Sequence, residues 1–284
     1  MARRTHRAIL AVLNVGLMVG VTSLAQASPI LFATGFEPPT FAPGLLQGQG
    51  GWYVFDSISV KAATISTELP RSGVQSLRLD GAQLEPFPPF GSVGFYEQNL
   101  NYDPLASGTA LIRLSYDINV AGPVSACASG FFDDPGSCAV GIGLDDPAFF
   151  PMAVIGVNIG DGLAFARAAC ADPNLCRAST PYTFGEWAHL SALYDFQNRT
   201  VSGFVNGVFI GEIPFSDGVG SEIAAIDVGL GHAGPDPVPG LVVHIDNVSV
   251  TAVPEPATVV LLATGLLAVG AVAVRRRRST STCL

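Results

Sequence analysis

Residues 187–211 read WAHLSALYDFQNRTVSGFVNGVFIG, and this stretch decides the fold. Apolar and polar residues alternate in runs that begin at Trp187, Thr200 and Val208, which is the period-two pattern of half-buried β-strands. Asn206-Gly207 separates the last two runs, and both residue types tolerate the positive φ angles of a tight hairpin turn. The stretch therefore predicts three antiparallel strands joined by short turns.

Similar short runs continue through the region from Ser28 to Ala252. Gly, Pro or Asp interrupts nearly every window in which an amphipathic helix would form. We expect strands at Ile30–Thr34, Trp52–Phe55, Ser76–Leu79, Ser92–Asn99, Ala110–Val120, Ala139–Leu144, Ala153–Ile159, Trp187–Asp195, Thr200–Val205, Val208–Pro214, Ala224–Gly229 and Val242–Val250. Many short strands separated by turn residues predict an all-β fold, a two-sheet antiparallel β-sandwich or jelly roll.

The first 27 residues have the three parts of a secretory signal peptide. Basic residues at the start are followed by an apolar run from Ala8 to Leu24 and by small residues at Ala25 and Ala27. Cleavage after Ala27, following export by the Sec machinery, leaves Ser28 as the first mature residue. The alternative is an uncleaved membrane anchor, for which the apolar run is short.

The C-terminal segment 253–284 has three features in a fixed order. A Pro-Glu-Pro motif is followed by an uncharged run over 257–274 and then by four consecutive arginines. At about 1.5 Å per residue the run is about 27 Å long, enough for a transmembrane helix, and the arginines would hold its end in the cytoplasm. The sorting residues are Pro254, Glu255, Pro256, Arg275, Arg276, Arg277 and Arg278.

This combination resembles the PEP-CTERM sorting signal of Gram-negative bacteria that make extracellular polysaccharide. The resemblance implies recognition by an exosortase, a membrane transpeptidase that cuts near Pro-Glu-Pro. The protein would pass through the inner membrane as an intermediate and go on to the cell surface or extracellular matrix. The motif residues would then be a substrate of another enzyme. An ordinary single-span tail anchor is the alternative; it explains the helix and the arginines but not Pro-Glu-Pro.

Between the two ends, several motifs resemble jelly-roll domains. The W-x-x-L-x-x-x-Y-D and T-V-x-x-x-V-N-G patterns within 187–211 are similar to concanavalin A-like, laminin-G-like domains. Residues 34–37 and 47–52 look like the opening of sandwich modules in other PEP-CTERM proteins. Residues 71–79 and 244–250 are similar to an early strand and the last strand of carbohydrate-binding modules. The resemblance implies one jelly-roll domain over 28–252, between a signal peptide at 1–27 and a sorting signal at 253–284.

The same resemblance implies a structural calcium ion. Carried over to this sequence, its ligands would be Glu37, Asp246 and the backbone oxygens around Ser72-Gly73. Two carboxylates with carbonyls and water can provide the six to eight oxygens that Ca²⁺ needs. The alternative is that Glu37 caps a turn and Asp246 accepts from a nearby backbone amide. Asp133-Asp134 and Asp145-Asp146 form further acidic pairs before proline, for which turn chemistry is favoured over chelation.

The cysteines fit an exported chain. Setting aside Cys283 in the tail leaves Cys127, Cys138, Cys170 and Cys176, an even number that predicts disulfides. Three pairings are open, and the sequence-local choice is Cys127 with Cys138 and Cys170 with Cys176. A metal site is the alternative, but the spacings lack paired C-x-x-C elements.

The charge of the middle region limits its partners. Ser28–Val250 contains 7 basic and 22 acidic residues, which argues against binding nucleic acid or an anionic membrane. Glycan binding needs an exposed aromatic platform. The candidates are Trp52, Tyr53, Phe87, Phe90, Phe131 and Phe132, although burial in the core is the alternative for Trp52 and Trp187.

Motifs for catalysis are absent from the sequence. No E-x-D-x-E or E-x-D-x-x-E pattern pairs carboxylates on one strand face, and Glu186 and Glu212 have no partner at strand spacing. Neither G-x-S-x-G nor H-E-x-x-H occurs. We therefore expect no catalytic residues and a non-enzymatic protein of the surface or matrix, structural or adhesive, with extracellular polysaccharide as a candidate ligand. Two alternatives stay open: a secreted glycan-active hydrolase or lyase with an unrecognised site, and a tail-anchored periplasmic binding protein.

Overall fold

The computed structural model describes residues 28–55, 58–88, 91–128, 135–172 and 175–253. Ile30–Ala252 forms one compact unit, and its strands make two antiparallel sheets, which confirms the prediction of an all-β sandwich. The expected signal peptide, the sorting residues and the expected transmembrane helix lie outside the described residues. No helix in the described ranges combines the length and hydropathy needed to cross a bilayer.

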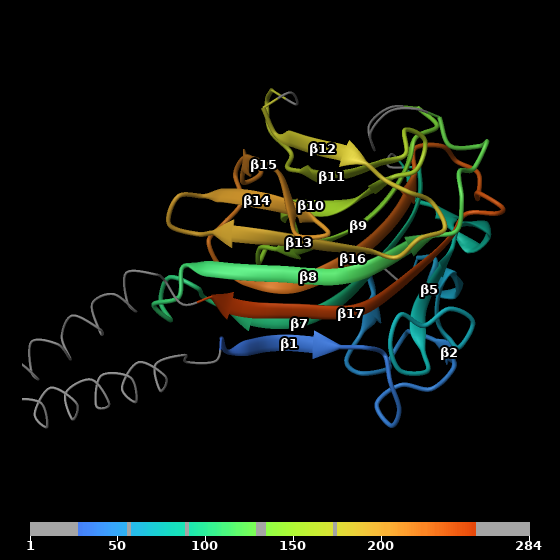
Figure 1. Ribbon diagram of the computed structural model, residues 1–284, viewed down its shortest axis with the longest axis horizontal. Helices are drawn as coiled ribbons and strands as arrows, with labels where there is room; N and C mark the ends of the chain where they lie inside the picture. Colours follow the sequence, from blue (N-terminus) through green and yellow to red (C-terminus); the bar gives the residue numbers. More distant parts are fainter. Residues whose placement is uncertain (1–27, 56–57, 89–90, 129–134, 173–174, 254–284) are drawn as a thin grey trace, which may run out of the picture. The chain divides into compact units, whose positions relative to one another are not determined.

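The described part of one sheet has the strand order β15-β14-β13-β8-β17-β5-β4-β2, and β1 also pairs with β17. We call it the front sheet, because β8, β13, β14 and β17 face the viewer in Figure 1. Its strands are β1 Ile30–Thr34, β2 Gly44–Leu45, β4 Ala63–Ser66, β5 Ser76–Asp80, β8 Leu111–Val120, β13 Ala188–Asp195, β14 Thr200–Val205, β15 Val208–Pro214 and β17 Val242–Val253.

The second sheet, the back sheet, lies behind it in Figure 1. Its order is β12-β11-β10-β9-β16-β7-β3, and β6 also pairs with β7. Its strands are β3 Tyr53–Val54, β6 Glu85–Pro86, β7 Ser92–Tyr102, β9 Cys138–Asp145, β10 Pro151–Asn158, β11 Leu163–Arg167, β12 Arg177–Pro181 and β16 Ile223–His232. Two short 3₁₀ turns, Val60–Ala62 and Gly81–Gln83, complete the described elements.

The core lies between the sheets because side chains alternate across each strand. On β8, Leu114 and Tyr116 point inward, and Tyr194 does so from β13; all three are fully buried. The hydroxyl of Tyr116 donates to the carbonyl oxygen of Ile155 at 2.6 Å, and that of Tyr194 donates to Ala153 at 2.8 Å. Two tyrosines of the front sheet therefore bond to the backbone of β10 in the back sheet.

The hairpin predicted at Asn206-Gly207 is present. The φ angles of these residues are 50° and 78°, and β13, β14 and β15 pair antiparallel on either side of their turns. Every other expected strand also forms, with ends that shift by up to three residues. The sequence reading missed β2, β4, β6, β11 and β12, which are short and contain Ala, Ser, Gly or Pro, residues of low strand propensity.

Both sequence-local disulfides form. Cys127–Cys138 joins the loop after β8 to the first residue of β9, and Cys170–Cys176 closes the connection between β11 and β12. The first bridge therefore constrains the connection from the front sheet to the back sheet, and the second constrains one connection within the back sheet.

Candidate functional site

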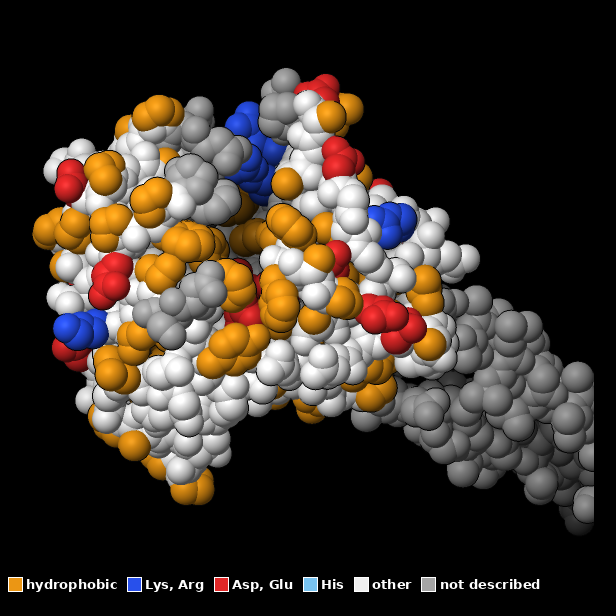
Figure 2. Space-filling view, turned by 180° about the vertical axis from the view of Figure 1, so that it is seen from behind, with side chains coloured by type: hydrophobic (Ala, Val, Ile, Leu, Met, Phe, Trp, Pro, Cys, Tyr) orange, Lys and Arg blue, Asp and Glu red, His pale blue; other side chains and the backbone are white. Residues whose placement is uncertain are grey.

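The outer face of the back sheet is hollowed. Strand alternation directs Val140 of β9 into the core and places Gly141 and Gly143 on the opposite face. Gly141 pairs with Gly156 of β10 and Gly229 of β16, whereas Gly143 pairs with Val154 and Asp227. A Cβ added at Gly141 would meet the Val154 side chain, and one added at Gly229 would meet Phe95, so these side chains lie close over the glycine backbone. Figure 2 shows this face, with acidic side chains in a central hollow, apolar side chains around it and basic side chains above.

Three carboxyl groups gather on this face: Glu97 of β7, Asp227 of β16 and Asp145 of β9, which we call the carboxyl trio. Asp227 pairs directly with Glu97, and Asp145 pairs with Ala225, two residues from Asp227 on the same face. Directly paired residues have Cβ atoms about 5 Å apart, and diagonal pairs about 7 Å. Glu97, Asp145 and Asp227 are only 3%, 3% and 8% exposed, so water screens their mutual repulsion poorly.

The trio is incompletely hydrogen-bonded. The Tyr53 hydroxyl of β3 donates to Glu97 and lies 3.4 Å from the Asn99 side-chain oxygen. Within the described part of the chain, the buried Oδ1 atoms of Asp145 and Asp227 have no hydrogen-bond partner. A buried polar atom without a partner costs about 1–3 kcal/mol, so two of them on one face call for a functional explanation.

The crowding of carboxyl groups shifts their acidity. Burial, followed by the charges of Glu97 and Asp146, raises the pKa of Asp145 to about 7. Burial and the charges of Asp145 and Glu97 hold the pKa of Asp227 well above its usual range. Burial, the hydrogen bond to Glu97 and the charge of Glu97 raise the pKa of Tyr53. The trio therefore retains at least one proton at neutral pH, because three ionised carboxylates would repel one another.

Exposed phenylalanines stand beside the trio. Phe149 and Phe150 are 46% and 64% exposed and lie in the turn that follows Asp145. Phe149 packs against Phe55, with ring centroids 6.1 Å apart, and Phe55 directly follows β3, the strand that carries Tyr53. We call Phe55, Phe149 and Phe150 the aromatic edge. It borders the hollow at the end where Asp145 lies.

The turn that carries the aromatic edge is held by Asp146. One carboxylate oxygen accepts from the backbone amides of Ala148 at 2.9 Å and Phe150 at 3.1 Å. The other accepts from the amide of Gly220 at 2.8 Å. The prediction that the Asp145-Asp146 pair serves a turn therefore holds for Asp146. Asp145 instead belongs to the carboxyl trio. Asp133 and Asp134 lie outside the described residues.

The same face carries positive charge toward β11 and β12. Arg167 and Arg177 are direct partners in the pairing of these strands, and Arg167 stands opposite Val154 of β10. Between them and the trio, Phe165 packs with Val154 and Ala139 in a small cluster separate from the main core. One row of cross-strand partners therefore leads from the two arginines through Val154 and Gly143 to Asp227 and Glu97 of the trio.

Glu37 and Asp246 come together at the turn that the resemblance named. Glu37 accepts from the backbone amides of Val74 at 2.9 Å and Gln75 at 3.0 Å. Asp246 accepts from those of Arg71 at 2.9 Å and Ser72 at 3.0 Å. These are the hydrogen bonds expected if the two carboxylates hold a turn and do not bind calcium. No three His, Cys, Asp or Glu side chains converge as a metal site anywhere in the described ranges, and a calcium ion held by two carboxylates and backbone oxygens stays a prediction.

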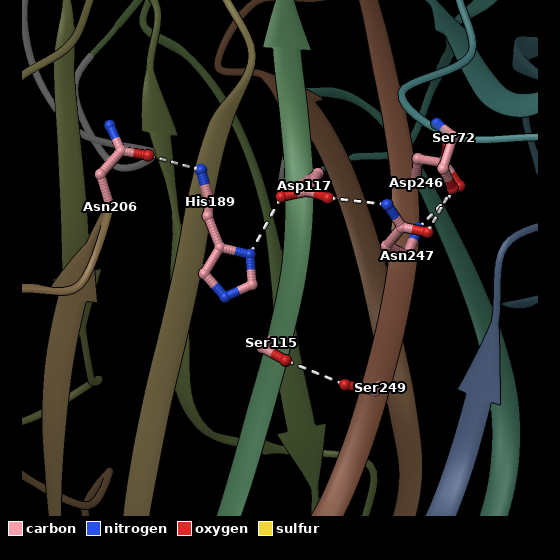
Figure 3. A network of polar contacts seen from close by, with 8 residues as sticks. All are labelled: Ser72, Ser115, Asp117, His189, Asn206, Asp246, Asn247 and Ser249. Carbon is pink, nitrogen blue, oxygen red and sulfur yellow. Dashed lines mark hydrogen bonds and ion pairs between the residues drawn. The ribbon is translucent and has the colours of Figure 1, made fainter.

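A polar network covers part of the front sheet (Figure 3). The ring Nδ1 of His189 lies 2.9 Å from Asp117, and the Asn247 amide donates to the other oxygen of Asp117 at 2.8 Å. Ser72 donates to Asn247 at 2.7 Å, and the His189 backbone amide donates to Asn206 at 2.8 Å. The network links the Ser72 turn to the Asn206 hairpin, so its contacts hold the sheet together.

The predicted aromatic platforms divide between core and surface. Trp52 is buried and packs against Phe36, as the core interpretation required. Tyr53, its neighbour, instead reaches the trio. Phe90, Phe131 and Phe132 lie outside the described residues. The trio itself was missed, because its members come from three strands that are distant in sequence. The available signal was that Glu97 and Asp227 are acidic residues within largely buried strands.

Comparison with protein families identifies the C-terminal segment. Residues 252–278 match the PEP-CTERM protein-sorting motif. The chain carries a PEP-CTERM signal. This signal implies an exported protein that an exosortase handles at the membrane. No curated protein matches the sequence.

The domain is similar to several solved structures at low sequence identity. A carbohydrate esterase from Shiga toxin-encoding bacteriophage phi24B is similar with a TM-score of 0.56 and 11% identity, over 80% of this chain and 100% of that one. A sialidase is similar with a TM-score of 0.48 and 15% identity, over 74% of this chain and 18% of that one. The ligand-binding domain of botulinum neurotoxin serotype D, solved with N-acetylneuraminic acid, has a TM-score of 0.48 and 8% identity, over 86% of this chain and 52% of that one. The esterase likeness shows a common fold and no more.

Proposed function

We propose that this PEP-CTERM protein is a component of the cell surface or extracellular matrix that binds glycan in the hollow of the back sheet. The observation that carries the proposal is the aromatic edge beside the carboxyl trio. Exported proteins of a polysaccharide-producing cell meet glycans where the exosortase delivers them. The acidic surface of the domain fits a neutral sugar polymer better than a strongly anionic one.

The chemistry of the hollow suits a sugar ring. The C–H faces of a pyranose are apolar and pack on aromatic rings, and Phe149 and Phe150 offer such rings to solvent. Sugar hydroxyls both donate and accept, so they are suited to hydrogen-bond with polar groups that border the hollow.

The test is binding to soluble polysaccharides by the protein recovered from its own host. We expect Phe149→Ala to weaken binding at least tenfold, since it removes a ring from the aromatic edge. The matched control is Phe209→Ala, which removes a ring of similar exposure from β15 of the front sheet and should leave affinity unchanged. Equal losses in both variants, or binding by neither variant nor wild type, would overturn the proposal.

A further inference from the structure

We propose that the hollow also hydrolyses a glycosidic bond of the glycan, with Asp145 as general acid and Glu97 as general base. This inference rests on the proposed function, because the hollow must first bind the glycan. Its foundation is the geometry of the trio: three buried carboxyl groups on adjacent strands of one hollowed face, two of them with an unpartnered oxygen. Glycan binding alone needs polar groups but does not need three carboxyl groups held against their own repulsion.

Asp145 has the properties of the acid. A general acid must be protonated at the working pH, and its proton must be close to the leaving oxygen. Burial and the charges of Glu97 and Asp146 bring the pKa of Asp145 to about 7. Its buried Oδ1 has no hydrogen-bond partner among the described residues, so the proton is not committed elsewhere. The aromatic edge begins four residues later on the same turn, where a sugar ring would stack beside it.

Glu97 has the properties of the base. The Tyr53 hydroxyl donates to its carboxylate, which favours the ionised form and fixes the orientation of the group. Glu97 and Asp145 lie on β7 and β9, with β16 between them. Neighbouring strands are about 4.8 Å apart and the partners of the two residues on β16 are two positions apart, so their backbones are separated by about 12 Å. Side chains that lean together across this span leave room for a water molecule, as inverting glycosidases require.

Asp227 stands between the acid and the base as a positioning residue. It is the direct cross-strand partner of Glu97. Burial and the charges of Asp145 and Glu97 raise the pKa of Asp227 well above its usual range, which favours the protonated form that can donate a hydrogen bond to a sugar hydroxyl.

The reaction balances with water as the only co-reactant. Asp145 gives its proton to the glycosidic oxygen as the bond from that oxygen to the anomeric carbon breaks. The oxygen of water bonds to the anomeric carbon, and one water proton passes to Glu97. The products are two shorter glycans, one with a new reducing end. Glu97 then loses its proton to solvent and Asp145 regains one, so no electron transfer is involved.

The experiment uses polysaccharides that bind in the previous test, drawn from β-glucan, xylan, alginate and the polysaccharide of the host itself. New reducing ends are measured from pH 4 to pH 9. We expect turnover that declines above about pH 7, with Asp145→Asn and Glu97→Gln each lowering it at least 100-fold while affinity changes less than threefold. The control Glu212→Gln removes a carboxylate from β15 of the front sheet and should keep full turnover.

The outcomes separate the two proposals. Binding that Phe149→Ala weakens, with no new reducing ends at any pH, overturns the hydrolase and leaves glycan binding in place. Turnover that survives Asp145→Asn and Glu97→Gln overturns the assignment of the trio. Unsaturated products that absorb near 235 nm would show elimination and overturn hydrolysis. Absence of binding to every probe overturns both proposals. Thermal melting of each variant shows whether lost turnover reflects lost folding.

Discussion

Asp227 stands directly opposite Glu97 where β16 pairs with β7. Two acids in this relationship repel each other, and like charges at directly paired positions destabilise a sheet. Both side chains are almost fully buried, so the repulsion is not relieved by water. Natural proteins keep such strain mainly where it has a function, because stability lost at one site must be recovered elsewhere.

Replacing Asp227 should therefore stabilise the protein in a pH-dependent manner. Its raised pKa means that the folded state holds a proton that the unfolded state releases above about pH 4. The free energy of unfolding then falls as pH rises through this window. We expect Asp227→Asn to raise stability at pH 8 by about 2 kcal/mol, or roughly 4–8 °C in Tm, and to have little effect at pH 4.

Thermal melts at several pH values test this prediction. Glu186→Gln is the control, because it removes an exposed acid of the same charge from a loop. An Asp227→Asn variant that is less stable than wild type at pH 8, or equally shifted at pH 4 and pH 8, would show that the trio carries no stored repulsion.

The hairpin could be predicted from the sequence, whereas the carboxyl trio could not. Asn206-Gly207 encodes its turn locally, since two adjacent residues with positive φ suffice to reverse the chain. Glu97, Asp145 and Asp227 meet only because β7, β16 and β9 are neighbours in the sheet. That order follows from the packing of the whole domain, and no local pattern specifies it. The proximity of Glu37 and Asp246 was predicted from the resemblance to jelly-roll modules, because a known fold tells which distant strands are neighbours and residue spacing does not.

The contribution of Asp117 to stability should depend on pH in the opposite direction to that of Asp227. Burial alone would raise the pKa of Asp117, but hydrogen bonds from His189 and Asn247 outweigh burial and lower it. An acid with a lowered pKa stabilises the fold above its unfolded value and loses this contribution as pH falls through the folded value. We expect Asp117→Asn to cost about 1–2 kcal/mol at pH 7, with the cost shrinking below pH 4. Urea unfolding at each pH measures it, and a cost that persists unchanged at pH 3 contradicts the prediction.

Calcium can be tested at the turn between Glu37 and Asp246. Burial and the charge of Glu37 act to raise the pKa of Asp246 against three backbone donors, and a cation between the two carboxylates would relieve this repulsion. We expect EDTA to lower Tm by several degrees and added Ca²⁺ to restore it. Glu37→Gln should abolish the EDTA effect. An unchanged Tm after EDTA, with no metal in the purified protein, would leave the backbone bonds as the whole function of these acids.

Gly73 provides an independent check on that turn. Its φ is +63°, and a Cβ at this position would lie 2.2 Å from a carboxylate oxygen of Glu37. Gly73→Ala must therefore push Glu37 away from the amides of Val74 and Gln75. We expect a loss of about 2–3 kcal/mol in urea unfolding. Gly240→Ala is the matched control, because its φ is +87° with no atom within 4 Å of the added Cβ. Similar losses in the two variants would assign the cost to backbone strain alone.

The PEP-CTERM signal makes a prediction about the mature chain. Cleavage by signal peptidase and exosortase should leave a product that begins at Ser28 and ends near Pro254-Glu255-Pro256. Intact mass of the protein from cells and medium, in a host with and without its exosortase, measures both ends. We expect the short product only when the exosortase is present, and a membrane-bound form that keeps Arg275–Arg278 when it is absent. A chain that retains its arginines in both hosts would be a tail-anchored periplasmic protein, and the glycan for its hollow would then have to be one found in the periplasm.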